Sequence, residues 1–548
     1  MRQANGGVLH VRRRSLPPFI TELWEDPTAF RTLVSACVAI AAVGLDPHIL
    51  DPGMPSIRVA LGQDESVRSL LMVSAVIQAG LLLLGGYLAD RYRSERLLRA
   101  ALAGLAITSV LAIPLGVETL VIPIRAIAWL CGGLVLPFAI GAIAIAYSGP
   151  ARATALGAAY GVLGASTAAW PALATINGAT GSAWPAFALC AIAAVIAWVA
   201  NRHLPDMPAA EPRHRSMILA VALFSFGVVA MVASVIQYGS QVDGLRVATF
   251  ILGLACVVVA LVPRAARRGA GAEPSDTRVD LRPVAVALAV GVVIGFAQAG
   301  PMLQLPQFFT YIQGSDPLVA TIAVAPFVVA LLVAGPLSGW MLQRIRPRSL
   351  IAGGAVAIGL ANILLAAILY RGTGYPWFII PYLLIGAGFV IATTVRTAVI
   401  FASVPKGLPA SAAALNEASI GMGSRIGVVV ALVATTTVAM QDYAAQVAGM
   451  SRDTAASELR AFRRLLEELN LRPMVELVAG LDVLTLRGYE DAVVEGMRWA
   501  WFLPGVVAIV TGILAWVAMG ARDPVQSVWE LADERPVPVP GEAPDRST

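Results

Sequence analysis

The segment Gly86-Tyr-Leu-Ala-Asp90-Arg91-Tyr-Arg93 follows an apolar block, and Gly339-Trp-Met-Leu-Gln343-Arg344-Ile-Arg346 follows a later apolar block in the same way. A second echo pairs Ala155-Leu-Gly157 through Gly164 with Ala414-Leu-Asn416 through Gly423. Because both echoes run in the same order, we predict that the chain contains two halves related as parallel repeats. Each half would contribute one six-helix bundle.

The composition of the 548-residue chain indicates a membrane protein. Hydrophobic residues make up 58% and charged residues 13%, whereas a soluble domain carries about 25% charged residues. The apolar residues gather in blocks of about 20, the length of a helix that crosses roughly 30 Å of hydrocarbon. We therefore expect an all-α polytopic membrane protein with about 14 transmembrane helices. The candidate spans lie near 32–50, 69–89, 97–116, 120–147, 155–176, 184–201, 216–237, 246–263, 283–305, 317–338, 349–370, 376–402, 412–440 and 499–520.

The distribution of arginine predicts the topology. Basic residues concentrate in alternate connections between the apolar blocks, so the positive-inside rule places both termini in the cytoplasm of a cell membrane. This topology also explains the net charge of +5, and we expect no nucleic-acid partner. The predicted domains are a cytoplasmic tail (1–30), an N-terminal six-helix bundle (31–203), two inserted helices with flanking loops (204–282), a C-terminal six-helix bundle (283–520) and a disordered cytoplasmic tail (521–548).

Residues 441–495 form a long polar insert that this topology places outside the cell. An amphipathic surface helix is predicted within it, because apolar and charged residues alternate at helical spacing. The apolar positions are Leu459, Phe462, Leu466 and Leu469, and the charged ones are Arg460, Arg463, Arg464, Glu467 and Glu468. Two interpretations remain open: a cap or lid over the outer mouth, and a docking module for an extracytoplasmic partner.

Charged residues inside apolar blocks are candidate functional residues, because each costs about 2.5–3.5 kcal/mol at a helix centre. Asp46, Arg125, Glu417 and Arg425 belong to this class. For Asp46 the alternative is a helix-end residue beside prolines, and for Arg125 a structural clamp on backbone carbonyls. Glu417 and Arg425 are eight positions apart and point in different directions on a helix, which makes Arg396 the candidate partner of Glu417.

Three of these features resemble motifs of the major facilitator superfamily. Gly86 to Arg91 resembles the signature between helices two and three, with Arg93 where that family usually has glycine. Leu45 to Pro55 resembles the helix-one motif, with Asp51 in place of the customary Asn. Arg125 resembles the family's membrane-embedded arginine of helix four. The span count and the inserted helix pair resemble the fourteen-helix drug:proton antiporter branch.

The resemblance implies a proton-coupled transporter, not an enzyme, that exports small amphipathic drugs or lipid-like compounds by alternating access. It implies a conformational gate at Gly86, Asp90 and Arg91, and proton coupling at Asp46, Asp51 and Arg125. The candidate cavity or substrate residues are Gln78, Gln298, Arg396, Asn416, Glu417 and Arg425. The expected partners are protons, a small-molecule substrate and the lipid bilayer. Uptake by the same fold and a non-transporting sensor or scaffold are the alternatives.

We expect no cofactor and no metal site. Only the segment from Asp46 through His48 to Asp51 brings potential ligands together, and no second histidine-rich segment accompanies it.

Overall fold

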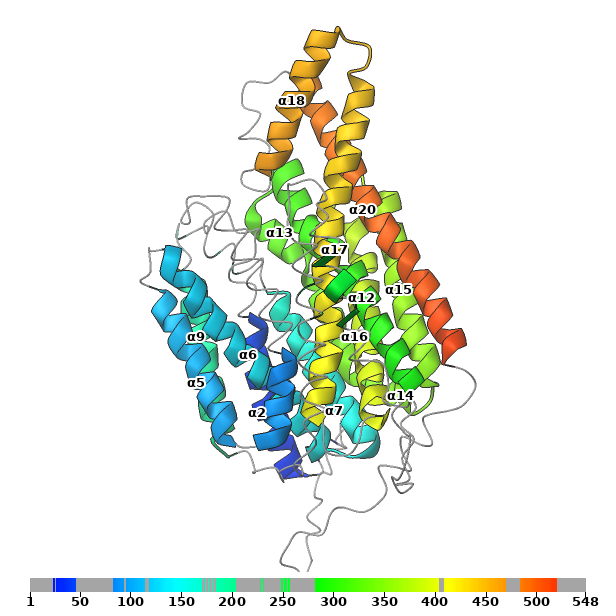
Figure 1. Cartoon of the computed structure of the whole chain (residues 1–548). Coiled ribbons are helices and arrows are strands. Elements are labelled where there is room, and N and C mark those ends of the chain that lie inside the picture. The colour runs from blue at the N-terminus through cyan, green and yellow to red at the C-terminus, as the bar shows by residue number, and fades with distance from the viewer. Residues whose placement is uncertain are drawn as a thin grey trace, which may run out of the picture.

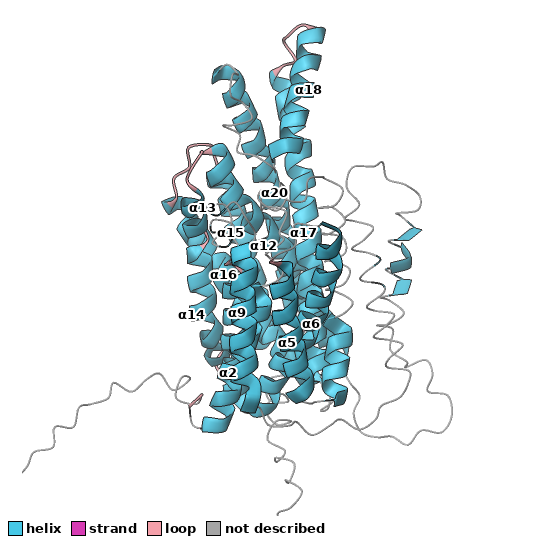
Figure 2. Cartoon of the chain, turned by 90° about the vertical axis from the view of Figure 1, so that its left-hand side faces the viewer, coloured by secondary structure: helices cyan, strands magenta, loops and turns pink. Residues whose placement is uncertain are grey.

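The computed structural model describes residues 23–24, 26–45, 82–92, 95–113, 118–169, 184–203, 281–403, 409–469 and 483–519, together with a few isolated positions between 173 and 256. All elements in these ranges are helices (Figure 2). Eight of them are long and apolar enough to cross a membrane. These features confirm the all-α polytopic fold class.

Several helices begin at a proline. Proline suits the first helical position because a backbone N–H group there would have no acceptor within the helix. The first described helix, α2 (Pro27–Leu45), is capped at its N-terminus by Asp26. Asp26 Oδ1 accepts the backbone N–H groups of Thr28 at 2.8 Å and Ala29 at 3.3 Å, and also the Thr28 hydroxyl. These hydrogen bonds hold the pKa of Asp26 below its usual value, and the bond from the Thr28 hydroxyl has the largest effect.

The N-terminal half is a bundle of tightly packed apolar helices. Its members are α2, a helix over 82–92, α5 (Glu95–Ala112), α6 (Glu118–Ala146), α7 (Gly149–Thr167) and α9 (Trp184–Ala200), which is followed by the short η2 (Asn201–His203). The helix α5 packs on α6 and α9, while α2 packs on α6, α7 and α9. Asn201 Nδ2 donates to the carbonyl of Ser35 at 3.1 Å, and Ser35 Oγ donates to the carbonyl of Ala200 at 3.1 Å. These bonds join α2 to the end of α9.

The C-terminal half is a second bundle. Its members are α12 (Leu281–Gln307), the π-helical η4 (Phe308–Ile312), α13 (Pro317–Ala323), α14 (Ala325–Leu342), α15 (Pro347–Ile368), α16 (Pro376–Ser403), α17 (Pro409–Gln446) and α20 (Val483–Ala518). A buried polar contact fixes three of them: Gln304 of α12 accepts Trp501 Nε1 at 2.8 Å and donates to Thr435 Oγ1 at 2.7 Å. Because each polar group has a partner, this contact is compatible with an apolar interior.

The two halves meet through small residues. The helix α7 packs on α14 and α16, and α17 packs on α6 (Figure 1). A Cβ added to Gly157 of α7 would lie 2.0 Å from the carbonyl oxygen of Gly335 in α14. Glycine is therefore required at this crossing, because the two backbones approach too closely for any side chain.

The two longest helices extend beyond the bundle. α17 has 38 residues and α20 has 36, which at 1.5 Å per residue corresponds to about 55 Å, well above the roughly 30 Å of a hydrocarbon core. Between them lies α18 (Arg452–Leu469), and the three form the projection at the top of Figure 1. The amphipathic helix predicted in this segment is thus present.

The two long helices continue into the edges of the predicted insert. Residues 441–446 continue α17, and residues 483–495 belong to α20. The sequence becomes polar where each helix passes beyond the apolar span. The helix nevertheless continues, because packing outside the bundle stabilises it. The rings of Tyr443, Phe462 and Tyr489 lie within 4.8 Å of one another, and Glu458 accepts the hydroxyls of both tyrosines at 3.0 and 3.1 Å.

Most of the predicted spans near 216–237 and 246–263, and most of both tails, lie outside the described residues. The placement of that helix pair, and with it the proposed domain limits, stays a prediction.

Candidate functional site: the boundary between the halves

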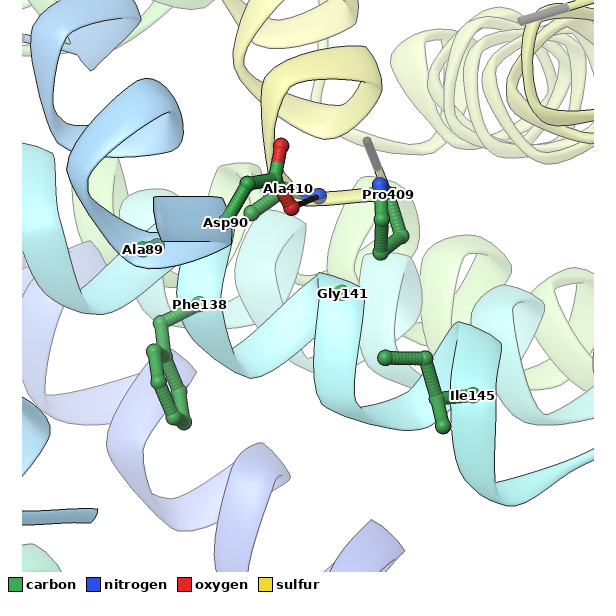
Figure 3. Close-up of a pocket in the computed structure, with 7 residues that line it drawn as sticks. All are labelled: Ala89, Asp90, Phe138, Gly141, Ile145, Pro409 and Ala410. Atoms are coloured by element: carbon green, nitrogen blue, oxygen red, sulfur yellow. Dashed lines mark hydrogen bonds between the residues drawn. The ribbon is translucent and has the colours of Figure 1, made fainter. Parts of the chain in front are cut away.

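Asp90, in the helix over 82–92, meets the opposite half of the molecule. Its side chain is buried, and its carboxylate accepts the backbone N–H group of Ala410 at 2.9 Å (Figure 3). The other carboxylate oxygen accepts the backbone N–H group of Ser411 at 2.7 Å. Since α17 begins at Pro409, these N–H groups belong to the first turn of the helix and have no intrahelical partner. The negative charge also lies at the positive end of the helix dipole.

Close approach at this point depends on two glycines. A Cβ added to Gly86 would lie 2.6 Å from Ala414 Cβ and 2.8 Å from the carbonyl oxygen of Ala410. On α6, a Cβ added to Gly141 would lie 3.1 Å from the Ala410 nitrogen. Larger residues would therefore push α17 away from Asp90.

Arg91, the next residue, behaves differently from Asp90. It is exposed, and its Nη1 donates to the Tyr87 hydroxyl at 3.2 Å within the same helix. Its guanidinium also lies 5.7 Å from the Tyr92 ring. These contacts keep Arg91 on its own helix and leave the contact with α17 to Asp90.

The repeated segment of the C-terminal half also approaches the start of a helix in the other half, but it has no carboxylate at that contact. A Cβ added to Gly339 of α14 would lie 2.3 Å from the Thr154 nitrogen near the start of α7, as Gly86 approaches the start of α17. Gln343, which corresponds to Asp90, is exposed. The charged contact with a helix N-terminus is thus a feature of the N-terminal repeat.

A second group of polar residues lies deeper in the C-terminal half. Arg396 of α16 is completely buried, and its Nη1 donates to the carbonyl of Ala287 in α12 at 3.0 Å and to Ser419 Oγ of α17 at 2.9 Å. Gly291 leaves space for the guanidinium, since a Cβ there would lie 1.6 Å from Nη1. Arg396 therefore links its own helix, α16, to both α12 and α17.

The same group reaches the N-terminal half through Tyr160 of α7. Asn416 Nδ2 donates to the Tyr160 hydroxyl at 3.0 Å and to Glu417 Oε1 at 3.2 Å. Ser419 Oγ donates to the carbonyl of Asn416 at 2.6 Å. The charges of Glu417 and Arg396 also act on each other, while the Arg396 guanidinium donates its hydrogen bonds to Ala287 and Ser419. A direct pair of Glu417 and Arg396 stays a prediction.

Sequence reasoning missed Tyr160 and Ser419. Both lie inside or beside the repeated segments, but a tyrosine or a serine in an apolar block carries no charge that would single it out. Their importance is visible only once α7 and α17 are packed together.

Arg125 of α6 is buried among aromatic rings. Its guanidinium carbon lies 5.6 Å from the Trp129 ring and 5.6 Å from the Phe187 ring of α9, with no side-chain exposure. Such contacts stabilise a buried cation through the ring quadrupoles. This environment fits the clamp interpretation as well as the coupling interpretation, and Asp46, its proposed partner, lies outside the described residues.

The other candidate residues are more dispersed. Gln298 of α12 is half-buried, and so is Arg425 of α17, two turns beyond Glu417. Asp51 and Gln78 lie outside the described residues. Within the described ranges, no group of three or more His, Cys, Asp and Glu side chains is arranged to hold a metal ion.

Taken together, the long apolar helices, the two bundles and the charged residues at their boundary define a polytopic membrane transporter. Residues 208–431 match the family model of the Major Facilitator Superfamily. Over this stretch the chain is similar to the major facilitator superfamily, whose members are transporters and not enzymes.

Two curated relatives carry names that concern antibiotics. The chain is 25% identical over 419 residues to the "Tetracenomycin C resistance and export protein" of Streptomyces glaucescens, with 73% of this chain and 74% of the relative covered. It is 26% identical over 530 residues to the "Puromycin resistance protein pur8" of Streptomyces alboniger, with 93% and 94% covered.

Solved structures share the fold at low identity. The proton:xylose symporter XylE, bound to 6-bromo-6-deoxy-D-glucose, has a TM-score of 0.55 and 14% identity, with 92% of this chain and 99% of that chain covered. An inward-facing bacterial homologue of the human lysosomal transporter Spinster has a TM-score of 0.50 and 14% identity, with 94% and 100% covered. At this identity the likeness concerns the fold alone.

Proposed function

We propose that the chain is a proton-driven exporter of small amphipathic molecules across the bacterial cell membrane, with both termini in the cytoplasm. The observation that carries this proposal is the set of charged and polar residues at the boundary of the halves, where Asp90 and Asn416 each bond across to the other half. Residues that bind across a moving boundary are suited to alternating access. The names of the two relatives support export and antibiotic-like substrates.

In this proposal Asp90 acts as the gate, with Gly86 providing the close approach. When α17 moves away, its first-turn N–H groups lose the carboxylate and gain water. The exchange costs little, because water replaces the lost hydrogen bonds. A gate of this kind opens and closes readily, and in this proposal the hydrogen bonds of Asp90 to α17 mark the state closed at that end.

The driving force follows from proton chemistry. One unit of pH gradient supplies about 1.4 kcal/mol per proton, and 100 mV supplies about 2.3 kcal/mol per charge. One or two protons per cycle would thus support substantial accumulation. Asp46, Asp51 and Arg125 remain the proton-coupling residues that the family resemblance proposes, and the fourteen-helix antiporter branch remains the proposed subfamily.

Transport in proteoliposomes tests the proposal. The full-length protein would be reconstituted, a pH gradient imposed, and the uphill movement of puromycin and tetracenomycin C measured, with xylose as a substrate of different chemistry. We expect gradient-dependent movement of the antibiotics and none of xylose. Antibiotic movement that ignores the pH gradient, or gradient-driven xylose movement alone, would contradict the proposal.

A further inference from the structure

One edge of the Arg396 guanidinium has no hydrogen-bond partner among the described residues. Arg396 of α16 is completely buried. Its Nη1 uses both N–H groups, since it donates to the carbonyl of Ala287 at 3.0 Å and to Ser419 Oγ at 2.9 Å. Nε and Nη2 are also buried, and no described residue accepts a hydrogen bond from them. These two atoms form the forked edge with which an arginine binds a pair of oxygen atoms.

The guanidinium is held in position by its other side. The two bonds of Nη1 orient the group, and Gly291 of α12 gives it room, since a Cβ added there would lie 1.6 Å from Nη1. An arginine that is already oriented loses little conformational entropy when a ligand binds. Unbonded N–H groups of a cation are costly in an apolar interior. The forked edge therefore favours a bound acceptor.

Glu417 of α17 does not supply that acceptor. Its Oε1 accepts Asn416 Nδ2 at 3.2 Å, and no hydrogen bond joins it to Nε or Nη2 of Arg396. A single water molecule offers one oxygen and no charge, whereas the fork matches two oxygens that share a negative charge. A carboxylate of a bound molecule fits this edge in both shape and charge.

The forked edge lies close to the boundary between the two halves. Ser419 Oγ, which accepts Arg396 Nη1, donates to the carbonyl of Asn416 at 2.6 Å, and Asn416 Nδ2 donates to the Tyr160 hydroxyl of α7 at 3.0 Å. The helix α16 also packs directly on α7. Separation of the halves during alternating access would therefore give a ligand a route to Arg396.

We propose that the Nε–Nη2 edge of Arg396 binds the carboxylate of a small amphipathic molecule. This inference rests on the proposed function and deepens it, because it names one class of substrate, the amphipathic carboxylates. A primary carboxamide of the same shape offers one oxygen and no charge, so it should bind weakly. An organic ammonium ion would be repelled by the guanidinium.

Binding of two matched probes tests the inference. The full-length protein would be placed in lipid nanodiscs at about pH 7, where the carboxyl group of 2-naphthoate is ionised. Equilibrium dialysis would measure the binding of 2-naphthoate and of 2-naphthamide, with empty nanodiscs as the blank for partition into lipid. We expect 2-naphthoate to bind about ten-fold more tightly or better, because its hydrogen bonds are charge-assisted. Equal binding of the two probes would overturn the inference.

Arg396→Lys tests the fork itself, because lysine keeps the charge but lacks the paired donors. We expect this variant to lose most of the preference for 2-naphthoate over 2-naphthamide. Arg344→Lys is the matched control, since Arg344 is exposed and lies 4.3 Å from the Trp340 ring of its own helix, α14. It should keep the preference of the parent. An unchanged preference in Arg396→Lys would contradict the assignment to Arg396.

Mass spectrometry provides a measurement on the unmodified sequence, in case Arg396→Lys does not fold. Phenylglyoxal reacts with arginine side chains, and 2-naphthoate should slow the modification of Arg396 several-fold, whereas 2-naphthamide should not. The exposed Arg463 of α18 is the internal control and should react equally in every sample. An Arg396 that is never modified, or that 2-naphthoate does not protect, would overturn the inference.

Failure of the proposed function has a different signature. A protein that prefers 2-naphthoate through Arg396 but moves no antibiotic along a pH gradient would contradict export and leave the carboxylate site standing. Gradient-driven antibiotic transport without any preference for 2-naphthoate would remove the carboxylate site alone.

Discussion

The Asp90 carboxylate accepts two backbone N–H groups, those of Ala410 at 2.9 Å and Ser411 at 2.7 Å, across 320 and 321 positions of sequence. It replaces the water that would otherwise solvate the start of α17 and adds a favourable charge–dipole interaction. The contact is therefore specific for one arrangement of the two halves, and it can be broken without unfolding either of them.

Asp90→Asn should reduce transport strongly while expression and membrane insertion stay near normal. The amide keeps the size of the side chain but loses the charge and one acceptor, which should destabilise the closed state by about 1–3 kcal/mol. This corresponds to a shift of roughly 5- to 150-fold in the equilibrium between closed and open molecules. Initial transport rates in proteoliposomes measure the effect. Gln343→Ala, at the corresponding exposed position, is the control and should transport like the parent. Unchanged transport rates for Asp90→Asn would contradict the gating role of Asp90.

Gly86→Ala should shift the same equilibrium by a steric route. The added Cβ would lie 2.6 Å from Ala414 Cβ, so the halves must separate for it to fit. We expect fewer closed molecules and therefore slower transport, measured as initial transport rates in proteoliposomes. Gly353→Ala is the matched control, because nothing lies within 4 Å of its added Cβ. Equal behaviour of the two variants would refute the steric argument.

Asp46→Asn should abolish uphill accumulation but preserve downhill exchange. A neutral amide mimics the size of the protonated acid and cannot release a proton, so binding and movement continue without coupling. Counterflow of radiolabelled substrate measures exchange, and an imposed pH gradient measures accumulation. Persistent uphill transport in this variant would assign proton transfer to Asp51 or Glu417 instead.

Phe462→Ala should loosen α18 and leave the membrane bundle intact. Phe462 has no exposed surface, stacks on Tyr489 and packs against Tyr443. Removing a buried phenylalanine costs about 3–5 kcal/mol. Hydrogen exchange should accelerate in residues 452–469, with little change in α12 or α15. Arg463→Ala, on the exposed face of the same helix, should exchange like the parent. Faster exchange throughout the bundle would contradict an independently packed projection.

The sequence by itself determined the membrane class, the helical fold, the repeat and the amphipathic character of α18. Each follows from local chemistry: apolar length satisfies the bilayer, and helical spacing gathers Phe462 and Leu466 on one face. It also singled out Arg396 and Glu417 by their charge inside apolar blocks, and Asp90 by the repeated segment and its resemblance to a family motif.

Only the tertiary structure decided what those residues touch. Nothing local specifies that Asp90 bonds the start of α17, that Tyr160 meets Asn416, or that Arg125 lies between two aromatic rings. These contacts join helices far apart in sequence, and they depend on how closely glycines such as Gly86 and Gly157 let backbones approach. The sequence also did not predict how far α17 and α20 extend. Beyond the bundle these helices are supported by aromatic packing between residues far apart in sequence, and not by hydropathy.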